Sequence, residues 1–204
     1  MEIKDRIIQS AGALFGQRGL KSVSMDDIAT HLSMSKKTLY KWFENKDQIV
    51  QASLELYLTT KQCDGQQLLN KAANAIDEFF IMLDWMRSQF ADIVPGIFYD
   101  MQKYYPSAWQ LWLDYKNTFV LAQIKANLER GIAEGLYRPE LDVEVIARMR
   151  LALIELLLNA EVYPPRQFKQ QRVQTCILEH FMLGIASLKG HKLINEYRHV
   201  TEEE

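Results

Sequence analysis

One stretch of the chain, residues 24–47, constrains the fold more than any other part of the sequence. It reads SMDDIATHLSMSKKTLYKWFENKD. Ser24 stands three residues before Asp27 and ahead of an apolar series, which is the pattern of a helix start whose side-chain oxygen caps free amides. A short helix is therefore expected to begin near Met25 and to end near Leu32.

A second helix is expected after a turn at residues 33–35, where Ser35 is a good N-terminal cap. Its two sides differ because residues three or four positions apart share one side of a helix. Leu39 and Phe43 form an apolar pair on one side. The other side is polar and basic, with Lys36, Lys37, Thr38, Tyr40 and Lys41. One face is therefore predicted to be buried and the other to be cationic.

A helix, a short turn and a second helix with basic residues near its start form the helix-turn-helix arrangement. In this arrangement the second helix enters the major groove of DNA. The sequence resembles the TetR family of transcriptional regulators through S-x-D-D-I-A-x-x-L, S-K-K-T-L-Y-K-W-F and N-K-D in register. Many members have glycine where this chain has Ser33. Because glycine adopts a positive φ at no cost, Ser33 is expected to strain the turn slightly.

The arrangement assigns DNA contacts to the second helix and to two flanking positions. Asn45 is expected to cap a further helix whose first turn carries Lys46, where free amides attract anions. Lys46 also matches a family position, and its alternative is a solvated surface lysine. The residues predicted to face DNA are Ser35, Lys36, Lys37, Thr38, Tyr40 and Lys41, with Ser24 and Lys46 on phosphates.

Charge is distributed unevenly along the chain. The formal net charge of -2 would argue against a nucleic-acid partner if it were spread evenly. Residues 1–48, however, contain eight Lys or Arg against six Asp or Glu, while the remainder has sixteen against twenty. Residues 35–46 hold four lysines and one glutamate. This is the basic concentration that phosphate contacts need.

The sequence argues against several other classes of protein. Cys63 and Cys176 are far apart and form no metal-ligand pair, so they are expected to be reduced thiols of a cytoplasmic protein, with redox sensing as the alternative. The N-terminus lacks the apolar core of a signal peptide. The longest apolar run, residues 151–158, is interrupted by Glu155 and is shorter than the ~20 residues of a membrane span. No metal, cofactor or membrane partner is expected.

Helical periodicity recurs along the chain without sustained strand alternation, so the predicted fold class is all α. A first helix should pack behind the helix-turn-helix and end at Gly19. A helix-turn-helix DNA-binding domain is predicted over residues 1–48, with a fourth helix from about 46 as connector. A larger helical-bundle domain for effector binding and dimerisation is predicted over residues 49–204.

Glycine and proline pairs divide the C-terminal part of the chain into long helices. The breaks fall at Asp64-Gly65, Pro95-Gly96 and Pro164-Pro165. Pro106 is suited to the first position of a helix. The helices are expected from residue 68 past 86, from 106 past 128, from 143 to about 163 and from about 167 to 188.

The helix of residues 143–163 is apolar nearly all round at residues 151–158, so it must be buried on more than one side. In the resembled family the last two long helices pair with their copies across a two-fold axis. The resemblance therefore implies a homodimer through these helices, which suits a two-fold symmetric double-stranded DNA operator. The alternative is a core formed wholly within one chain.

Aromatic residues gather between residues 85 and 119, which hold almost half of the chain's aromatics. Such a cluster is typical of an apolar small-molecule site, although ordinary core packing is the alternative. Arg148 and Arg150 lie on nearly opposite sides of an otherwise apolar helix, so one can face the interior and an acidic ligand or Glu155. Surface ion pairs are the alternative for both. The predicted effector-pocket residues are Trp85, Phe98, Tyr99, Trp109, Trp112, Tyr115, Phe119 and Arg148.

These observations favour a sequence-specific DNA-binding regulator, a repressor that a small-molecule effector of unknown identity releases from its operator. A dimeric DNA-binding adaptor without an effector is the main alternative. An enzyme on a helical bundle is poorly supported, because His31, His180, His191 and His199 form no metal or catalytic motif and no phosphate-binding glycine loop is present. No catalytic residue is therefore predicted.

Overall fold

The computed structural model describes residues 2–90, 96–157, 159, 161–164 and 166–198. Over these residues the chain forms helices and no strand, and an isolated bridge joins Tyr137 to Ala186. The predicted all-α fold class is therefore confirmed. None of the helices in this described part is long and apolar enough to cross a membrane.

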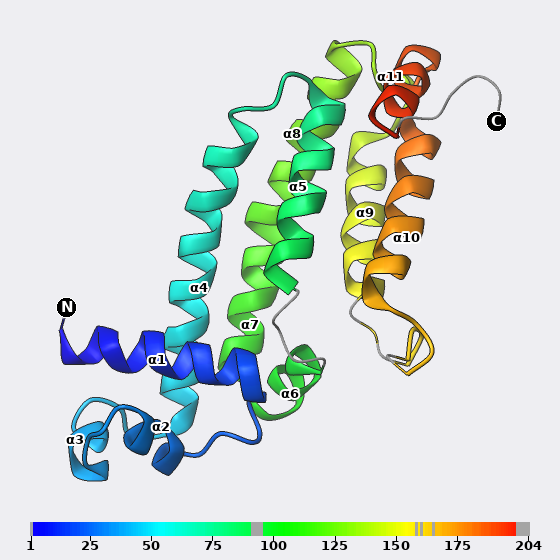
Figure 1. The fold of residues 1–204 in the computed structure, drawn as a ribbon. Helices are drawn as coiled ribbons and strands as arrows, with labels where there is room; N and C mark the ends of the chain where they lie inside the picture. The colour runs from blue at the N-terminus through cyan, green and yellow to red at the C-terminus, as the bar shows by residue number, and fades with distance from the viewer. Residues whose placement is uncertain (1, 91–95, 158, 160, 165, 199–204) are drawn as a thin grey trace. The chain divides into compact units, whose positions relative to one another are not determined.

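The helices follow one another as labelled in Figure 1. They are α1 Ile3–Arg18, α2 Met25–His31, α3 Lys36–Tyr40, α4 Lys46–Leu69, α5 Ala75–Phe90, α6 Ile97–Tyr104, α7 Pro106–Tyr115, the π-helix η1 Lys116–Val120, α8 Leu121–Ala133, α9 Val143–Leu157, α10 Gln170–Ile185 and α11 Leu188–Arg198. Gly19 ends α1 as expected, with a φ of 84°. The side-chain oxygen of Asn45 accepts the N–H of Gln48 at 3.0 Å, which confirms the expected cap of α4.

The break expected at Asp64-Gly65 is wrong, because α4 continues to Leu69. Gly65 is buried inside the helix, and a Cβ added there would lie 3.7 Å from the indole ring of Trp85. The ring therefore covers the side of the helix that the glycine leaves bare. The real break follows α4, where the side-chain oxygen of Asn74 accepts the N–H of Asp77 at 2.9 Å and begins α5.

The ends of the last helices also differ from the expectation. α9 ends at Leu157 rather than near residue 163, and residues 158, 160 and 165 lie outside the described part of the chain. The single helix expected to run to residue 188 is instead α10 followed by α11. Ala186 is extended, and the Ser187 hydroxyl accepts the N–H of Gly190 at 3.1 Å. This cap starts α11 as a separate helix.

The helix expected from Pro106 contains a change of hydrogen-bonding register. α7 passes at Lys116 into the π-helix η1, and α8 follows from Leu121. Helix α6 precedes α7 and is not predicted by the sequence, which indicates only a break at residues 95–96. Pro95 itself lies outside the described residues.

Two compact units make up the chain, each with its own apolar core. The first comprises Met1–Asp64 and Ser88–Tyr115, and the second comprises Gly65–Arg87 and Lys116–Glu204. The helix-turn-helix belongs to the first unit, and α9 and α10 belong to the second. The boundary predicted at residue 48 separates a DNA-binding domain from an effector-binding domain, whereas the two units are defined by packing. The predicted boundary therefore stays a prediction.

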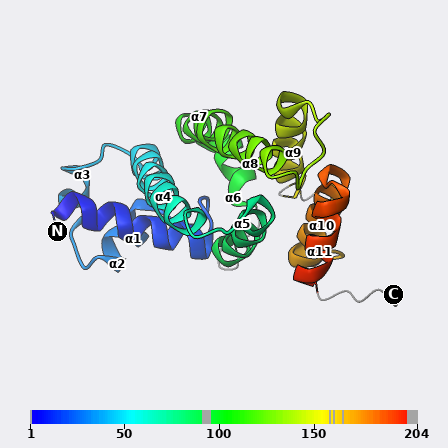
Figure 2. The ribbon, with the colours of Figure 1, turned by 90° about the horizontal axis from the view of Figure 1, so that it is seen from above.

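Within the first unit, α1 crosses the N-terminal half of α4, as both ribbon views show (Figure 1, Figure 2). The hydroxyl of the buried Ser53 on α4 donates to the carbonyl of Ile8 on α1 at 3.0 Å. Gly12 faces the same serine, and a Cβ added there would lie 3.5 Å from the Cβ of Ser53. Because small residues meet at the crossing, the helix behind the helix-turn-helix lies close against α4.

Within the second unit, Tyr137 joins the start of α5 to α8. Its side chain is 1% exposed, and its hydroxyl lies 3.1 Å from both the carbonyl oxygen of Ala75 and the side-chain oxygen of Asn127. Burial raises the pKa of this phenol well above its usual range, so the hydroxyl stays protonated and can donate. The ring packs on the bare backbone of Gly131, where a Cβ would overlap it.

This packing predicts that Gly131→Ala lowers the free energy of unfolding by about 1 to 3 kcal/mol, because the added methyl group must displace a ring held by buried hydrogen bonds. Urea unfolding measures the change. Gly16→Ala on α1 is the control, since nothing lies within 4 Å of a Cβ at that position. Alanine there is expected to stabilise the helix by about 0.5 to 1 kcal/mol. Equal losses for both variants would contradict the packing described.

Candidate functional site

Helix α2 begins at a reciprocal cap. The hydroxyl of Ser24 accepts the N–H of Asp27 at 3.1 Å, and the carboxylate of Asp27 accepts the N–H of Ser24 at 2.7 Å. The Ser24 hydroxyl also donates to the Asp27 carboxylate at 2.5 Å, and this bond, together with the one from the Ser24 N–H, lowers the pKa of the Asp27 carboxyl below its usual value. The predicted start of the helix at Met25 is confirmed, and its first turn is fixed from both sides.

The turn between α2 and α3 requires an unusual backbone conformation. Ser33 has a φ of 52°, in the left-handed region that non-glycine residues seldom adopt. The N–H of Ser33 donates to Thr30 and the N–H of Met34 donates to Ala29, each at 3.0 Å. These two hydrogen bonds close a tight turn, in which Ser33 adopts the left-handed conformation. The strain expected from a serine at this position is therefore present.

Helix α3 is short and is held at its start and along one side. The hydroxyl of Ser35 accepts the N–H of Thr38 at 3.1 Å and lies 2.9 Å from the Thr38 hydroxyl. Leu39 is fully buried and Phe43 is 4% exposed, so both belong to the core of the first unit. Burial of this pair leaves the opposite side of α3 facing solvent.

The polar side of α3 is exposed, as its sequence pattern predicted. Lys36, Lys37 and Lys41 are exposed, and the Tyr40 side chain is 50% exposed. Lys36 pairs with Asp26 on α2. In the described part of the chain, no carboxylate lies within ion-pair distance of Lys37 or Lys41. These two ammonium groups and the Tyr40 hydroxyl are therefore available to a partner.

Lys46 at the start of α4 is engaged inside the first unit. Its ammonium group donates to the carbonyl of Leu20 and lies 5.9 Å and 5.4 Å from the ring centroids of Phe15 and Tyr105. Burial lowers the pKa of this ammonium, although the carboxylate of Asp100 opposes the shift. The alternative of a solvated surface lysine does not describe this environment. Lys46 connects α4 to the segment between α1 and α2.

The predicted effector-pocket residues fall in both compact units. Trp85 and Phe119 belong to the second unit. In the first unit Trp112 lies 5.1 Å from Phe98 and 6.1 Å from Tyr115, measured between ring centroids. The first unit also holds Trp109, half-buried against its core, and Tyr99, which is 59% exposed. For Phe98, Trp109 and Trp112, these contacts favour the alternative of core packing, whereas Tyr99 is exposed.

Arg148 and Arg150 point in opposite directions, as their spacing predicted. Arg148 is exposed, and its Nε donates to the carboxylate of Glu144 at 2.6 Å. Arg150 is the interior residue, at 6% exposure. Glu155, considered as a partner for an interior arginine, pairs with Lys116 of η1 instead. The spacing allowed one arginine to face inward, and the predicted pocket residue was Arg148, but the interior residue is Arg150.

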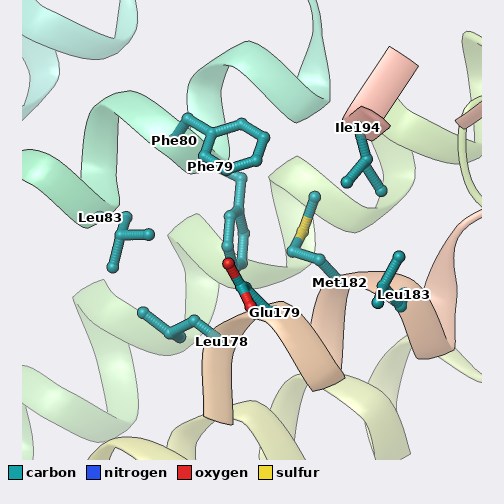
Figure 3. Close-up of a pocket in the computed structure, with 8 residues that line it drawn as sticks. All are labelled: Phe79, Phe80, Leu83, Leu178, Glu179, Met182, Leu183 and Ile194. Carbon is teal, nitrogen blue, oxygen red and sulfur yellow. The ribbon is translucent and has the colours of Figure 1, made fainter. Parts of the chain in front are cut away.

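A small pocket with about 10 Å³ of free space, room for about one water molecule, lies in the second unit between α5, α10 and α11 (Figure 3). Its lining is apolar except for one carboxylate: Phe79, Phe80, Leu83, Leu178, Glu179, Met182, Leu183 and Ile194. None of the predicted pocket residues lines it. The sequence holds no local signal for such a site, because its walls come from helices that are far apart along the chain.

Two of the sequence expectations concern metals and thiols. In the part of the chain that the structure describes, no group of three or more His, Cys, Asp or Glu side chains is arranged to hold a metal ion. Cys63 and Cys176 are exposed free thiols. They belong to different compact units.

The N-terminal part of the chain matches a known family. Residues 7–53 match the sequence model of the bacterial regulatory proteins, tetR family. The uncharacterized HTH-type transcriptional regulator YvaF of Bacillus subtilis is 30% identical over 183 residues, which cover 89% of this chain and 95% of YvaF. The HTH-type transcriptional repressor KstR2 of Mycolicibacterium smegmatis is 29% identical over 152 residues, which cover 71% of this chain and 72% of KstR2. These relatives are transcriptional regulators rather than enzymes.

A solved structure shares the fold along almost the whole chain. SmeT in its complex with triclosan has a TM-score of 0.69 at 16% identity, and the match covers 91% of this chain and 92% of SmeT. At this identity the likeness shows the fold alone. The helix-turn-helix and the helical second part therefore occur together in both proteins.

The geometry predicts different consequences for two lysine substitutions. Lys37→Ala is expected to change the preference between DNA sequences by roughly 1 to 3 kcal/mol, because Lys37 is exposed on α3 and unpaired within the described chain. Lys46→Ala is expected to weaken binding to all sequences similarly and to lower the salt slope by about one unit if its ammonium leaves Leu20 for a phosphate. Fluorescence anisotropy against two duplexes over a range of salt measures both effects.

Lys71→Ala is the matched control, since Lys71 is an exposed lysine outside the helix-turn-helix. It is expected to leave preference and slope unchanged. Thermal unfolding of Lys46→Ala separates the two roles of that residue. Loss of stability with an unchanged salt slope would show that Lys46 holds the first unit together and does not contact phosphate.

Proposed function

We propose that this chain, which belongs to the TetR family of bacterial regulatory proteins, is a homodimeric repressor released from a two-fold symmetric DNA operator by a small-molecule effector. It is a helix-turn-helix transcriptional regulator, and regulators of this family bind DNA operators and act as dimers. The repressor role is supported by its relative KstR2, which is an HTH-type transcriptional repressor. The operator symmetry, the effector and the individual contact residues belong to the proposal.

The observation that carries the proposal is the exposed cationic side of α3. Its backbone is fixed by the Ser35 cap and by burial of Leu39, so Lys37, Tyr40 and Lys41 are presented on a rigid support. A helix held in this way can enter the major groove without losing conformational entropy on binding, because it is already ordered. We assign base readout to this side, with Ser35, Lys36 and Thr38 beside it. Ser24 and Lys46 are assigned to phosphates.

Dimerisation is assigned to α9 and α10, which pack against each other within the second unit (Figure 1). On α9, Val145 is 59% exposed and Met149 is 45% exposed, one helical turn apart. On α10, Cys176, His180 and the open-sided Gly184 are exposed at four-residue steps. A second copy related by a two-fold axis would cover this surface. The exposure of Val145 and Met149 speaks against the alternative of a core formed wholly within one chain.

The effector separates this proposal from that of a DNA-binding adaptor. The small pocket in the second unit has about 10 Å³ of free space, far below the range of ligand pockets, which begins near 300 Å³. SmeT, which shares the fold, is solved with triclosan bound. The small-molecule complex of a protein with this fold supports an effector for this chain, and linkage provides the test.

The proposal predicts that the effector and the operator weaken each other's binding by one common factor, of about 5 to 150-fold, because linkage is reciprocal. The operator is obtained by selection from random duplexes, and the effector is identified by native mass spectrometry of protein purified from its own host. Each is then titrated with and without the other. Equal effector affinities in the two titrations would exclude induction and leave the adaptor function.

The assigned interface predicts that Met149→Glu weakens the dimer at least about 100-fold, because the two copies would each bury an unpaired carboxylate. Sedimentation equilibrium measures the dissociation constant, and operator affinity is expected to fall with it. Leu188→Glu on α11 is the matched control, as Leu188 is 86% exposed and lies outside the assigned interface. A dimer that tolerates Met149→Glu as well as Leu188→Glu would place the interface elsewhere.

A further inference from the structure

Two lysines outside the helix-turn-helix lie around one exposed tyrosine of the first unit. The ammonium group of Lys21, in the segment between α1 and α2, lies 5.6 Å from the ring centroid of Tyr104 on α6. The ammonium group of Lys103 lies 5.3 Å from the same centroid and 5.4 Å from that of Tyr99. These four residues, which we call the α6 patch, are all exposed. They belong to one compact unit, so the fold of that unit brings them together.

The α6 patch carries two positive charges that the chain does not neutralise. Among the residues that the structure describes, no carboxylate lies within ion-pair distance of Lys21 or Lys103. Asp100, the acidic residue of α6, instead stabilises the charge of Lys46. The hydrogen bond that Lys103 donates to the Tyr99 hydroxyl, at 3.2 Å, raises the pKa of the ammonium above its usual value. Because two like charges near one ring repel each other, an anion that contacts both lysines would be attracted to the patch.

The α6 patch is continuous with the position assigned to phosphate at the start of α4. Leu20, the residue before Lys21, accepts the ammonium of Lys46 with its carbonyl oxygen. Tyr105, the residue after Tyr104, has its ring centroid 5.4 Å from the same ammonium. Helix α6 lies beside the C-terminal end of α1 in both ribbon views (Figure 1, Figure 2). Both segments that hold Lys46 therefore lead directly into the patch.

We propose that the α6 patch is a second contact surface for the sugar–phosphate backbone of operator DNA, which it binds without reading bases. Its occupant is the same duplex whose major groove receives α3. Lys21 and Lys103 supply the charge, since ammonium groups donate to phosphate oxygens. The Tyr99 hydroxyl accepts from Lys103, so its own proton remains to donate to a phosphate. The proposal rests on the proposed function and adds to it a contact from α6.

The position of the patch favours DNA over other polyanions. Anionic membranes and acidic proteins would also be attracted by two lysines. The duplex, however, can contact α3, Lys46 and the patch at the same time, and linked contacts strengthen one another. Helix α6 lies outside residues 7–53, the part of the chain that matches the family model. The contact therefore follows from the packing of α6 in this chain and not from the family match.

Salt-dependent operator binding by the full-length protein tests the two charges. Lys21→Met and Lys103→Met each remove one charge and keep an unbranched side chain. Each is expected to lower the slope of log K against log salt by about 0.9, and the double variant by about 1.8. Because the patch contacts no base, the affinity ratio between the operator and a mismatched duplex is expected to stay within about twofold of the wild-type ratio. Lys103→Arg keeps the charge and is expected to keep the slope.

Lys61→Met is the matched control. Lys61 also lies over the ring of a tyrosine four residues earlier, with its ammonium 5.5 Å from the centroid of Tyr57. It lies on α4 about 22 Å along the helix from Lys46, and its substitution removes the same charge. Its slope is expected to equal that of the wild type. Equal changes of slope for Lys61→Met and Lys103→Met would overturn the inference, since net charge alone would then explain them.

A structural role for the ring contacts gives a different result. If the lysines only hold α6 in place, Lys103→Met would lower the affinity and the melting temperature at an unchanged salt slope. That outcome would overturn the inference.

Acetylation of the wild-type lysines, read by mass spectrometry, tests the surface without any substitution. With operator at roughly ten times its dissociation constant, acetylation of Lys21 and Lys103 is expected to slow about tenfold, because only the free protein reacts there. Lys61 is expected to react at the same rate with and without operator. Unprotected Lys21 and Lys103, in a complex whose Lys37 is protected, would overturn the inference.

The same measurements separate the inference from the function on which it rests. A wild-type protein that binds no duplex selected from random sequences would overturn both. Sequence-specific binding with one slope for the wild type, Lys21→Met and Lys103→Met would overturn the inference and leave the DNA-binding regulator. Protection of the two lysines by phosphatidylglycerol vesicles, but not by operator, would overturn it in favour of a membrane surface.

Discussion

The fixed shape of α3 is the constraint on which the DNA-facing side of this protein depends. A helix of five residues is far too short to persist alone in water, because nucleation costs more than so few hydrogen bonds return. Two features supply the difference: the Ser35 cap at one end, and the fully buried Leu39, held with Phe43 in the core of the first unit. The lysines and the tyrosine of α3 therefore owe their common orientation to an apolar pair on its other side.

The features that the sequence revealed are those decided by residues within one helical turn of each other. The caps by Ser24, Ser35 and Asn45, the turn at Ser33 and the two-sided character of α3 are all of this kind. What the sequence concealed depends on distant partners. Helix α4 continues through Gly65 where the ring of Trp85 covers it. The chain breaks between α10 and α11 where the N–H and the hydroxyl of Ser187 donate to the carbonyls of Leu136 and Gly135, at 2.9 Å and 2.7 Å. Likewise, periodicity allowed one of Arg148 and Arg150 to face inward and could not choose between them. The packing of Arg150 against Phe79 and Phe181 comes from other helices, and it is Arg150 rather than the predicted Arg148 that is buried.

The two compact units use polar groups in opposite ways. In the first unit the cationic groups of α3 remain in water, where an unpaired charge costs little, and they are exposed to a partner. In the second unit, the buried Lys116 and the half-buried Arg130 are matched by carboxylates from neighbouring helices. The buried Arg150 has no such carboxylate within the described chain, and its guanidinium lies against the rings of Phe79 and Phe181. Groups that depart from local rules of stability are where function is most reasonably sought, since stability alone gives no reason to keep them.

The positive φ of Ser33 bears on how easily serine and glycine can replace each other at this position of the turn. Glycine at this position would remove a backbone strain of about 1 to 2 kcal/mol in the folded chain. It would also enlarge the conformational freedom of the unfolded chain, which costs about 0.4 to 1 kcal/mol. The two terms have opposite signs and similar size, so the net gain from glycine is small. A serine can therefore persist in the turn by chance and be exchanged for glycine without a selective penalty, even though the turn geometry itself stays fixed.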